Sequence, residues 1–149
     1  MKEDTKLAEE RFYELMKRVR KLGLDTYPQE NKTVSLSQMA FLDYIAGLPG
    51  CGVHDIASGM QLTPPTVSVS VRKMEANQLL ERKPDPIDGR AVKLFLTRRG
   101  QTLQRRIKAY LTQKFRRLLA GLSPQEQDML LQLLEKALQV AEAEKSITE

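Results

Sequence analysis

Apolar residues recur along most of this chain at the three- and four-residue spacing that is typical of amphipathic α-helices. A strand pattern is confined to Leu79–Lys83 and Val92–Leu96. The polar stretch 25–34, which contains Pro28, predicts a loop. The chain is therefore predicted to be mainly α with a small β element. Helices are expected at residues 5–24, 35–46, 53–60, 98–119 and from 124 onward, with a further short helix that begins at Pro64 and ends near Asn77.

Capping residues stand where the periodic segments begin and end. Thr63 can accept a hydrogen bond from the first helical turn, and Pro64 suits the first helical position because its missing N–H costs nothing there. Ser35 and Gln38 fit a capping box. These signals fix the expected helix boundaries more closely than periodicity alone. Further caps are expected at Thr97, at Ser123 with Glu126, and at the stop residues Gly23 and Gly121.

The short helix after Thr63 has two contrasting faces. Val67, Val71 and Met74 recur at i, i+4 and i+7 and form an apolar stripe. The other face is small, polar and almost free of carboxylates until Glu75, so it can enter a major groove without repelling phosphate. Its residues are Pro65, Thr66, Ser68, Val69 and Arg72, with Lys73 beside them.

The two strands that follow are joined by a segment dense in turn formers, residues 84–90. Within it, Asp88-Gly89 is a strong hairpin signal, and Arg90 comes just after it. A helix-turn-helix followed by a basic-tipped hairpin is the element order of a winged helix. An arginine at such a tip can reach a neighbouring minor groove.

This region resembles the MarR family of bacterial regulators. The resemblance rests on the wing sequence Asp85-Pro86-Ile87-Asp88-Gly89-Arg90, on the Leu96-Thr97-Arg98-Arg99-Gly100 that follows, and more loosely on residues 55–75. One departure is visible, because the family's glycine at the end of the recognition helix is replaced here by Gln78. Asn77 tolerates the left-handed conformation, so the cap is expected to shift to it.

The resemblance implies a winged helix-turn-helix at residues 35–100, flanked by dimerisation helices at 1–34 and 101–149. The implied partners are double-stranded DNA and a second copy of the chain, and the implied effector is a small aromatic or phenolic anion held between the dimer helices and the winged-helix lobe. Such a regulator would bind a pseudo-palindromic operator, normally as a repressor. Residues of suitable chemistry for the effector are Tyr13, Met16, Arg20, Met39 and Tyr44, although each is equally well explained as a core or surface residue.

The distribution of charge supports a nucleic-acid partner. The whole chain of 149 residues has a formal net charge of +5. Residues 60–100 contain eight lysines and arginines against four aspartates and glutamates, whereas residues 1–59 contain eight against nine. The excess is therefore greatest where DNA contact is expected. A merely basic, solvated surface would also fit charge alone.

Enzyme chemistry finds little support. His54 is the only histidine and Cys51 the only cysteine, which leaves neither a histidine-based acid–base pair nor a cysteine metal cluster. A redox role for Cys51 is an alternative to a buried, inert thiol. No catalytic residue, cofactor or metal is expected. The charged N-terminus and the lack of a long apolar run predict a cytoplasmic protein without a membrane partner.

Two further readings remain open within DNA binding. One is a regulator that has no small-molecule effector, and the other is an architectural DNA-binding protein. An enzyme on a DNA-binding fold is a third alternative, and it would require a catalytic group that the sequence does not reveal.

Overall fold

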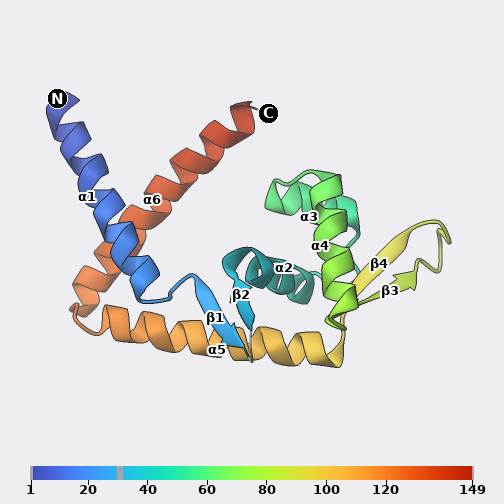
Figure 1. The fold of residues 1–149 in the computed structure, drawn as a ribbon. Coiled ribbons are helices and arrows are strands. Elements are labelled where there is room, and N and C mark those ends of the chain that lie inside the picture. Colours follow the sequence, from blue (N-terminus) through green and yellow to red (C-terminus); the bar gives the residue numbers. More distant parts are fainter. Residues whose placement is uncertain (1, 30–31, 149) are drawn as a thin grey trace. The chain divides into compact units, whose positions relative to one another are not determined.

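The structure is a computed structural model that describes residues 2–29 and 32–148 (Figure 1). The chain forms two compact units, residues 1–111 and 112–149. The elements are α1 (Lys2–Lys21), β1 (Thr26–Gln29), β2 (Lys32–Ser35), α2 (Leu36–Gly47), α3 (Val53–Met60), α4 (Pro64–Ala76), β3 (Leu80–Pro84), β4 (Val92–Leu96), α5 (Arg98–Leu119) and α6 (Pro124–Thr148).

The core of the first unit is the predicted winged helix. The stripe of Val67, Val71 and Met74 on α4 is buried, as the sequence pattern predicted. It packs with apolar side chains from α2, α3, the β3–β4 hairpin and the first half of α5. This burial orients α4, because only its polar face is left for solvent or a ligand. The fold class, mainly α with a small β wing, is confirmed.

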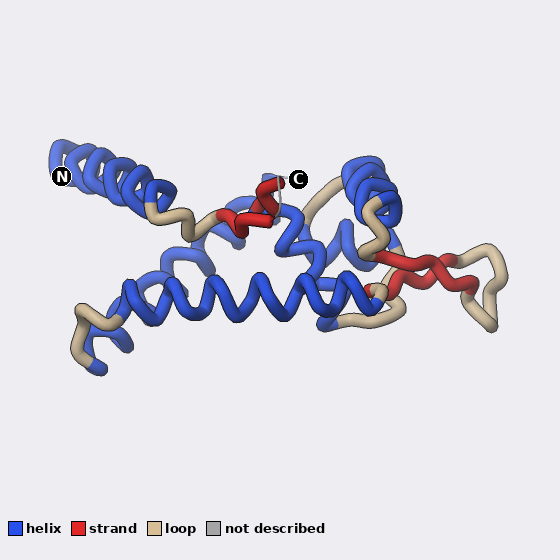
Figure 2. The backbone as a smooth tube through the Cα atoms, turned by 60° about the horizontal axis from the view of Figure 1, so that its bottom comes forward, coloured by secondary structure: helices blue, strands red, loops and turns tan. Residues whose placement is uncertain are grey.

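The wing is an antiparallel pair, with a register that runs from Leu80↔Leu96 to Pro84↔Val92. Figure 2 shows this hairpin extending away from the helices with its loop at the far end. Cys51 adds a short bridge beside β4, in which the Leu94 N–H donates to the Cys51 carbonyl at 2.9 Å. Its backbone pairing anchors the root of the wing to the end of α2.

The prediction of a polar loop at residues 25–34 is wrong, because β1 and β2 pair there as antiparallel strands. Residues 30–31 of the predicted loop lie outside the described residues. Tyr27 lies opposite Val34; Val34 is buried, and Tyr27 packs against the core. Pro28 is tolerated because each strand of a two-stranded ribbon has a free edge. The few apolar residues of this stretch therefore decide its structure.

The recognition helix ends differently from the prediction. Asn77 keeps a right-handed conformation, with φ −86°, and its side-chain amide donates to the Lys73 carbonyl at 2.9 Å. Gln78 instead takes the left-handed conformation, with φ 58°. Its carbonyl accepts a 2.6 Å hydrogen bond from the Thr97 hydroxyl, which helps to hold it. A non-glycine residue in this region costs roughly 1–2 kcal/mol, which the surrounding contacts must offset.

Other boundaries shift by a few residues. Helix α1 ends at Lys21 rather than residue 24, because Gly23 turns left-handed at φ 63°. Strand β3 begins at Leu80, one residue later than predicted. The caps at Ser35, Thr63, Thr97 and Ser123 are confirmed by their hydrogen bonds.

The second unit contains the end of α5 and α6. The Gln127 amide donates to the carbonyls of Leu119 and Leu122, both at 3.1 Å, and so fastens the start of α6 to the connecting turn. Much of the apolar surface of α6 is exposed in this single chain. None of the helices in the described ranges 2–29 and 32–148 is both long and apolar enough to cross a membrane. The exposed apolar side chains include Met129, Leu130, Leu131, Leu133, Leu134, Leu138 and Val140.

Candidate nucleic-acid interface

Helices α3 and α4 form the helix-turn-helix. Gln61 takes a left-handed conformation, with φ 53°, so the chain turns sharply after α3. The Thr63 hydroxyl then caps α4 by accepting from the Thr66 N–H at 3.4 Å, and the two threonine hydroxyls lie 2.8 Å apart. The start of α4 is thus held by its own side chains, which fixes the direction in which its exposed face points.

The structure places most of the predicted contact residues of α4 on its open face. Val69 is 46% exposed, a suitable state for an apolar contact with a thymine methyl. Arg72 is exposed, and its Nε donates only a long 3.4 Å hydrogen bond to the Ser68 carbonyl. Ser68 itself is half-buried. Pro65, Thr66 and Lys73 are exposed.

The tip of the wing is a loop within the segment of turn formers that the sequence predicted between the two strands. It spans residues 85–91 and is closed by the Asp85 N–H, which donates to the Ala91 carbonyl at 3.0 Å. The Asp85 carboxylate accepts from the N–H groups of Ile87 at 2.8 Å and Asp88 at 3.3 Å. These bonds, above all that from Ile87, together with the nearby Lys93 ammonium, lower the pKa of Asp85. Asp85 therefore organises the loop from its first residue.

Ion pairs occupy the other cations of the wing but leave Arg90 available. Lys83 lies 3.2 Å from Glu81, and Lys93 lies 3.8 Å from Asp85. Arg90 is exposed, and its guanidinium has no carboxylate within 4.0 Å among the described residues. Its backbone N–H donates to the Asp88 carboxylate at 3.1 Å, which fixes the backbone from which the side chain projects.

A pair of charges joins the recognition helix to the wing. Glu75 of α4 accepts a 2.6 Å hydrogen bond from the Arg82 guanidinium of β3, and this bond raises the pKa of Arg82 above its ordinary value. The pair neutralises the one carboxylate of α4. Sequence reasoning missed it, because residues seven apart across a helix end meet only through the tertiary fold.

A hollow of about 290 Å³ lies beside α4, where α2 begins. Lys73 lines it together with Ser70 of the same helix and Ser37 of α2. An ammonium group beside hydroxyls is suited to a phosphate oxygen. The serines around the start of α2 could have indicated this site from the sequence. The site was missed because Ser35 was interpreted only as part of a capping box. The complete lining is Ser35, Ser37, Gln38, Phe41, Ser70, Lys73 and Met74.

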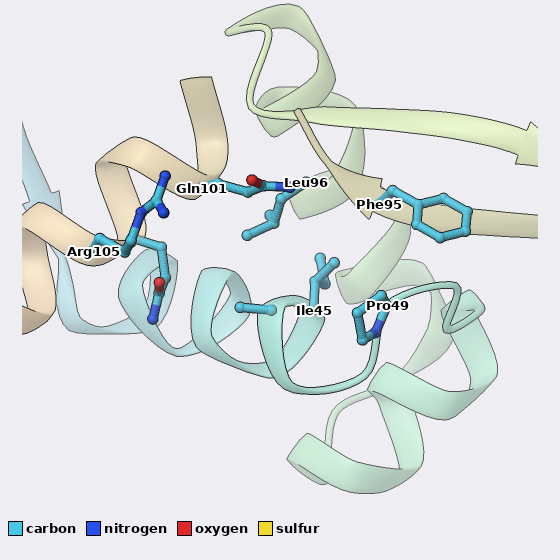
Figure 3. A pocket seen from close by; sticks show the side chains of 8 residues that line it. Ile45, Pro49, Phe95, Leu96, Gln101 and Arg105 are labelled. Atoms are coloured by element: carbon cyan, nitrogen blue, oxygen red, sulfur yellow. The ribbon is translucent and has the colours of Figure 1, made fainter. Parts of the chain in front are cut away.

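A second hollow of about 210 Å³ lies between α2, β4 and α5 (Figure 3). Ile45, Phe95 and Leu96 give it an apolar side, and Gln101 and Arg105 give it a polar one. This volume is below the roughly 300 Å³ at which small-molecule pockets usually begin.

The residues proposed from sequence for an effector lie elsewhere. Met39 is buried in the core, and the Tyr44 hydroxyl donates to the Asp55 carbonyl at 2.9 Å. Tyr13, Met16 and Arg20 lie on α1 and are exposed. The structure therefore places these five residues in different surroundings.

The two residues considered for chemistry lie in different environments. His54 is exposed on α3. Cys51 is buried, and burial raises the pKa of its thiol above the ordinary value. A raised pKa reduces the thiolate fraction, so this environment opposes reactivity toward oxidants.

Comparison with known proteins identifies relatives that match the helix-turn-helix and part of the wing. The family described as "MarR family" matches residues 34–92, which contain α2, α3, α4 and β3. YkoM of Bacillus subtilis, described as an uncharacterized HTH-type transcriptional regulator, is 36% identical over 85 residues. That match covers 57% of this chain and 55% of YkoM, so the chain spans about half the length of this relative.

Solved structures extend the similarity over most of the chain. FabT of Streptococcus pneumoniae, crystallised in complex with DNA, has a TM-score of 0.76 at 20% identity and matches 96% of this chain and 99% of FabT. That likeness concerns the fold. The regulator PcaV of Streptomyces coelicolor, crystallised with its natural ligand, has a TM-score of 0.60 at 26% identity, with coverage of 72% and 77%.

Proposed function

We propose that this chain is a member of the MarR family of winged-helix transcriptional regulators, and that it is a sequence-specific DNA-binding regulator that acts as a homodimer. Its place of action would be the cytoplasm, where a bacterial chromosome lies. Bases would be read by α4 in the major groove, and Arg90 would enter the adjacent minor groove.

The observation that carries this proposal is the availability of the cations on one surface of the winged helix. The carboxylate of Glu75 is neutralised by Arg82, while Arg72 and Lys73 remain exposed on α4 and Arg90 of the wing has no ion pair with any residue that the structure describes. A phosphate partner requires such cations, and most of the affinity would come from phosphate contacts. In this arrangement Val69 packs on a thymine methyl, Arg72 forks to a guanine, and Lys73 contacts phosphate from the hollow beside Ser37 and Ser70. Pro65, Thr66 and Ser68 complete the groove-facing surface.

Dimerisation is supported by the apolar surface that a single chain leaves exposed. In α6, Leu134 and Leu138 are 42% and 58% exposed, and Phe12 and Leu15 of α1 are similarly open. An exposed apolar surface of this extent marks an interaction site. A second copy of the chain is the proposed partner, and its symmetry would be matched by inverted half-sites in the operator.

Repression and release by an effector complete the proposal. A dimer that covers two half-sites would exclude other proteins from the same duplex. The structure of PcaV contains a natural ligand. For this chain we propose a small aromatic or phenolic anion, held between the dimer helices and the winged-helix lobe.

Selection of bound sequences from random duplexes, with and without a library of aromatic anions, tests the proposal. We expect an enriched inverted repeat that binds at least ~10³-fold more tightly than a scrambled duplex. A ratio near one would replace the proposal with an architectural DNA-binding role. An enriched site that no tested anion releases would favour a regulator without an effector of this class.

A further inference from the structure

A third hollow, of about 670 Å³, lies where the start of α5 meets β1. It is separate from the proposed DNA-binding surface, because no residue of α4 or of the wing lines it. Three arginines of α5 line it, and none of its lining residues in the described ranges 2–29 and 32–148 is a carboxylate. The full lining is Tyr27, Pro28, Arg98, Arg99, Thr102, Leu103 and Arg106.

The arginines of this hollow carry charges that no described carboxylate balances. Among the described residues, Arg98, Arg99 and Arg106 form no ion pair within 4.0 Å. The whole of α5 contains eight arginines and lysines and no acidic residue, so its own surface supplies no compensating charge. Like charges on one helix repel, and cations in a first turn are disfavoured by the helix dipole. An anion in the hollow would remove both penalties.

The geometry of α5 indicates how such an anion would be held. Arg98, Thr102 and Arg106 follow one another at four-residue spacing, so they share one face of the helix. Arg98 and Arg106 are separated by about 12 Å along the axis, a distance that their long side chains can close from both ends. The Thr102 hydroxyl donates to the Arg98 carbonyl at 2.9 Å, so the arginine side chains and the Tyr27 hydroxyl are the other side-chain donors among the lining residues.

An aromatic residue of β1 also lines the hollow, and a second aromatic residue packs against it. Tyr27 of β1 lines it, and its ring packs edge-to-face against Tyr110 of α5, with 5.2 Å between ring centroids. This contact fixes β1 beside the arginines. The hollow is thus built from two elements rather than from one basic helix surface.

We propose that Arg98, Arg99 and Arg106 bind a small phosphate-bearing molecule that carries at least two negative charges. Guanidinium groups form bidentate hydrogen bonds with phosphate oxygens. A compact group with two or more negative charges balances three neighbouring cations better than a single carboxylate does. The phosphates of DNA share this chemistry. We assign the site to a free small molecule, because no residue of α4 or of the wing is among those that line the hollow.

Calorimetric titration of the full-length protein with inorganic pyrophosphate tests the assignment, with sodium chloride added to keep the ionic strength constant. We expect saturable binding that Arg106→Gln and Arg99→Gln each weaken about tenfold, a loss of about 1.4 kcal/mol. The matched control is Arg105→Gln, which removes the same charge from the neighbouring position on α5 but does not line this hollow. It should change the affinity less than about twofold. Thermal unfolding without pyrophosphate checks that the variants are folded.

Two results would overturn the proposal. If Arg105→Gln weakens pyrophosphate binding as much as Arg106→Gln does, or if binding does not saturate, the arginines form only a basic surface. If Arg106→Gln lowers the affinity for duplex DNA more than Arg105→Gln does, the phosphate bound here belongs to the DNA backbone.

Discussion

Arg72 and Arg90 carry the same charge, but the chain holds them in different ways. Arg72 lies on a rigid helix whose other face is buried, whereas Arg90 lies on a loop that is ordered by the carboxylates of Asp85 and Asp88. The first position favours contact with base edges, and the second favours entry into a minor groove. Their contacts with DNA stay predictions, and the two roles lead to different outcomes on substitution.

Replacing Arg72 with Ala should weaken binding to the best operator by ~1–3 kcal/mol and relax the preference at one base pair. The reason is the loss of a bidentate contact to a guanine, which other bases cannot offer. Titration against the operator and a scrambled duplex measures both effects. If both duplexes are bound more weakly by the same factor, Arg72 contacts a phosphate rather than a base. Neighbouring residues of α4 would then recognise the bases.

Replacing Arg90 with Ala should lower affinity across many sequences and reduce the slope of log affinity against log salt by roughly one. The minor groove distinguishes little beyond A·T from G·C, so sequence preference should change less than for Arg72. Titrations at several salt concentrations measure the slope, and Arg105→Ala controls for the loss of one charge. An unchanged slope and affinity would show that the wing does not touch DNA.

Asp85 makes the stability of the wing loop depend on pH in the acid range. Because its pKa is lowered in the folded chain, its carboxylate stabilises the loop fully above the ordinary pKa of about 3.9. That contribution is lost as the pH falls through the lowered value. NMR should therefore show the Ile87 amide shifting only below about pH 3.9, and Asp85→Asn should remove this titration. A midpoint at or above the ordinary pKa would contradict the hydrogen-bonded loop.

At the scale of elements, the end of α4 and the start of α5 form one joint. The Thr97 hydroxyl donates to the Gln78 carbonyl at 2.6 Å, and the Thr97 N–H donates to the Leu79 carbonyl at 3.0 Å. Gly100 lies so close to the Leu79 backbone that a side chain there would strike its carbonyl oxygen. The direction of the recognition helix is therefore coupled to α5.

Gly100→Ala should destabilise the protein by about 1–3 kcal/mol, because backbone at the joint must move to admit a methyl group. Gly47→Ala is the matched control, since nothing lies within 4 Å of a methyl group there, and it should stay within about 0.5 kcal/mol. Urea denaturation of both variants gives the two free energies of unfolding. Equal stability of Gly100→Ala and the parent chain would refute the close approach.

The sequence predicted the helices well, because periodicity and caps are local signals. Ser35 with Gln38 and Thr63 with Pro64 marked two helix starts that the structure reproduces. The β1–β2 hairpin was not predictable from its polar composition, because its stability depends on Tyr27 and Val34 reaching the core. The left-handed Gln78 was missed for a similar reason, since Thr97, nineteen residues away, holds its carbonyl.

The candidate interface was predictable only in outline. The exposed face of α4 followed from the buried stripe, and the position of Arg90 followed from the wing sequence. The pairing of Glu75 with Arg82 and of Lys93 with Asp85 depends on strand register, which no local pattern reveals. These pairs decide which cations remain available, so the sequence could name candidate cations but could not rank them.

For the whole molecule, we propose that two chains read one operator together. The exposed leucines of α6 are the proposed contact between the chains, and burial of an unpaired charge there would be costly. Leu134→Glu should therefore weaken dimerisation and operator binding together. Gln139→Glu adds the same charge to an exposed polar position of α6 and should leave both unchanged.

Sedimentation of the protein, alone and on a duplex with inverted half-sites ~10 bp apart, tests this claim most directly. At micromolar concentration we predict twice the mass of one chain in solution and two chains on each duplex, with Leu134→Glu shifted to monomer and bound more weakly. A monomer that binds a single half-site with the full affinity of the parent protein would contradict the account.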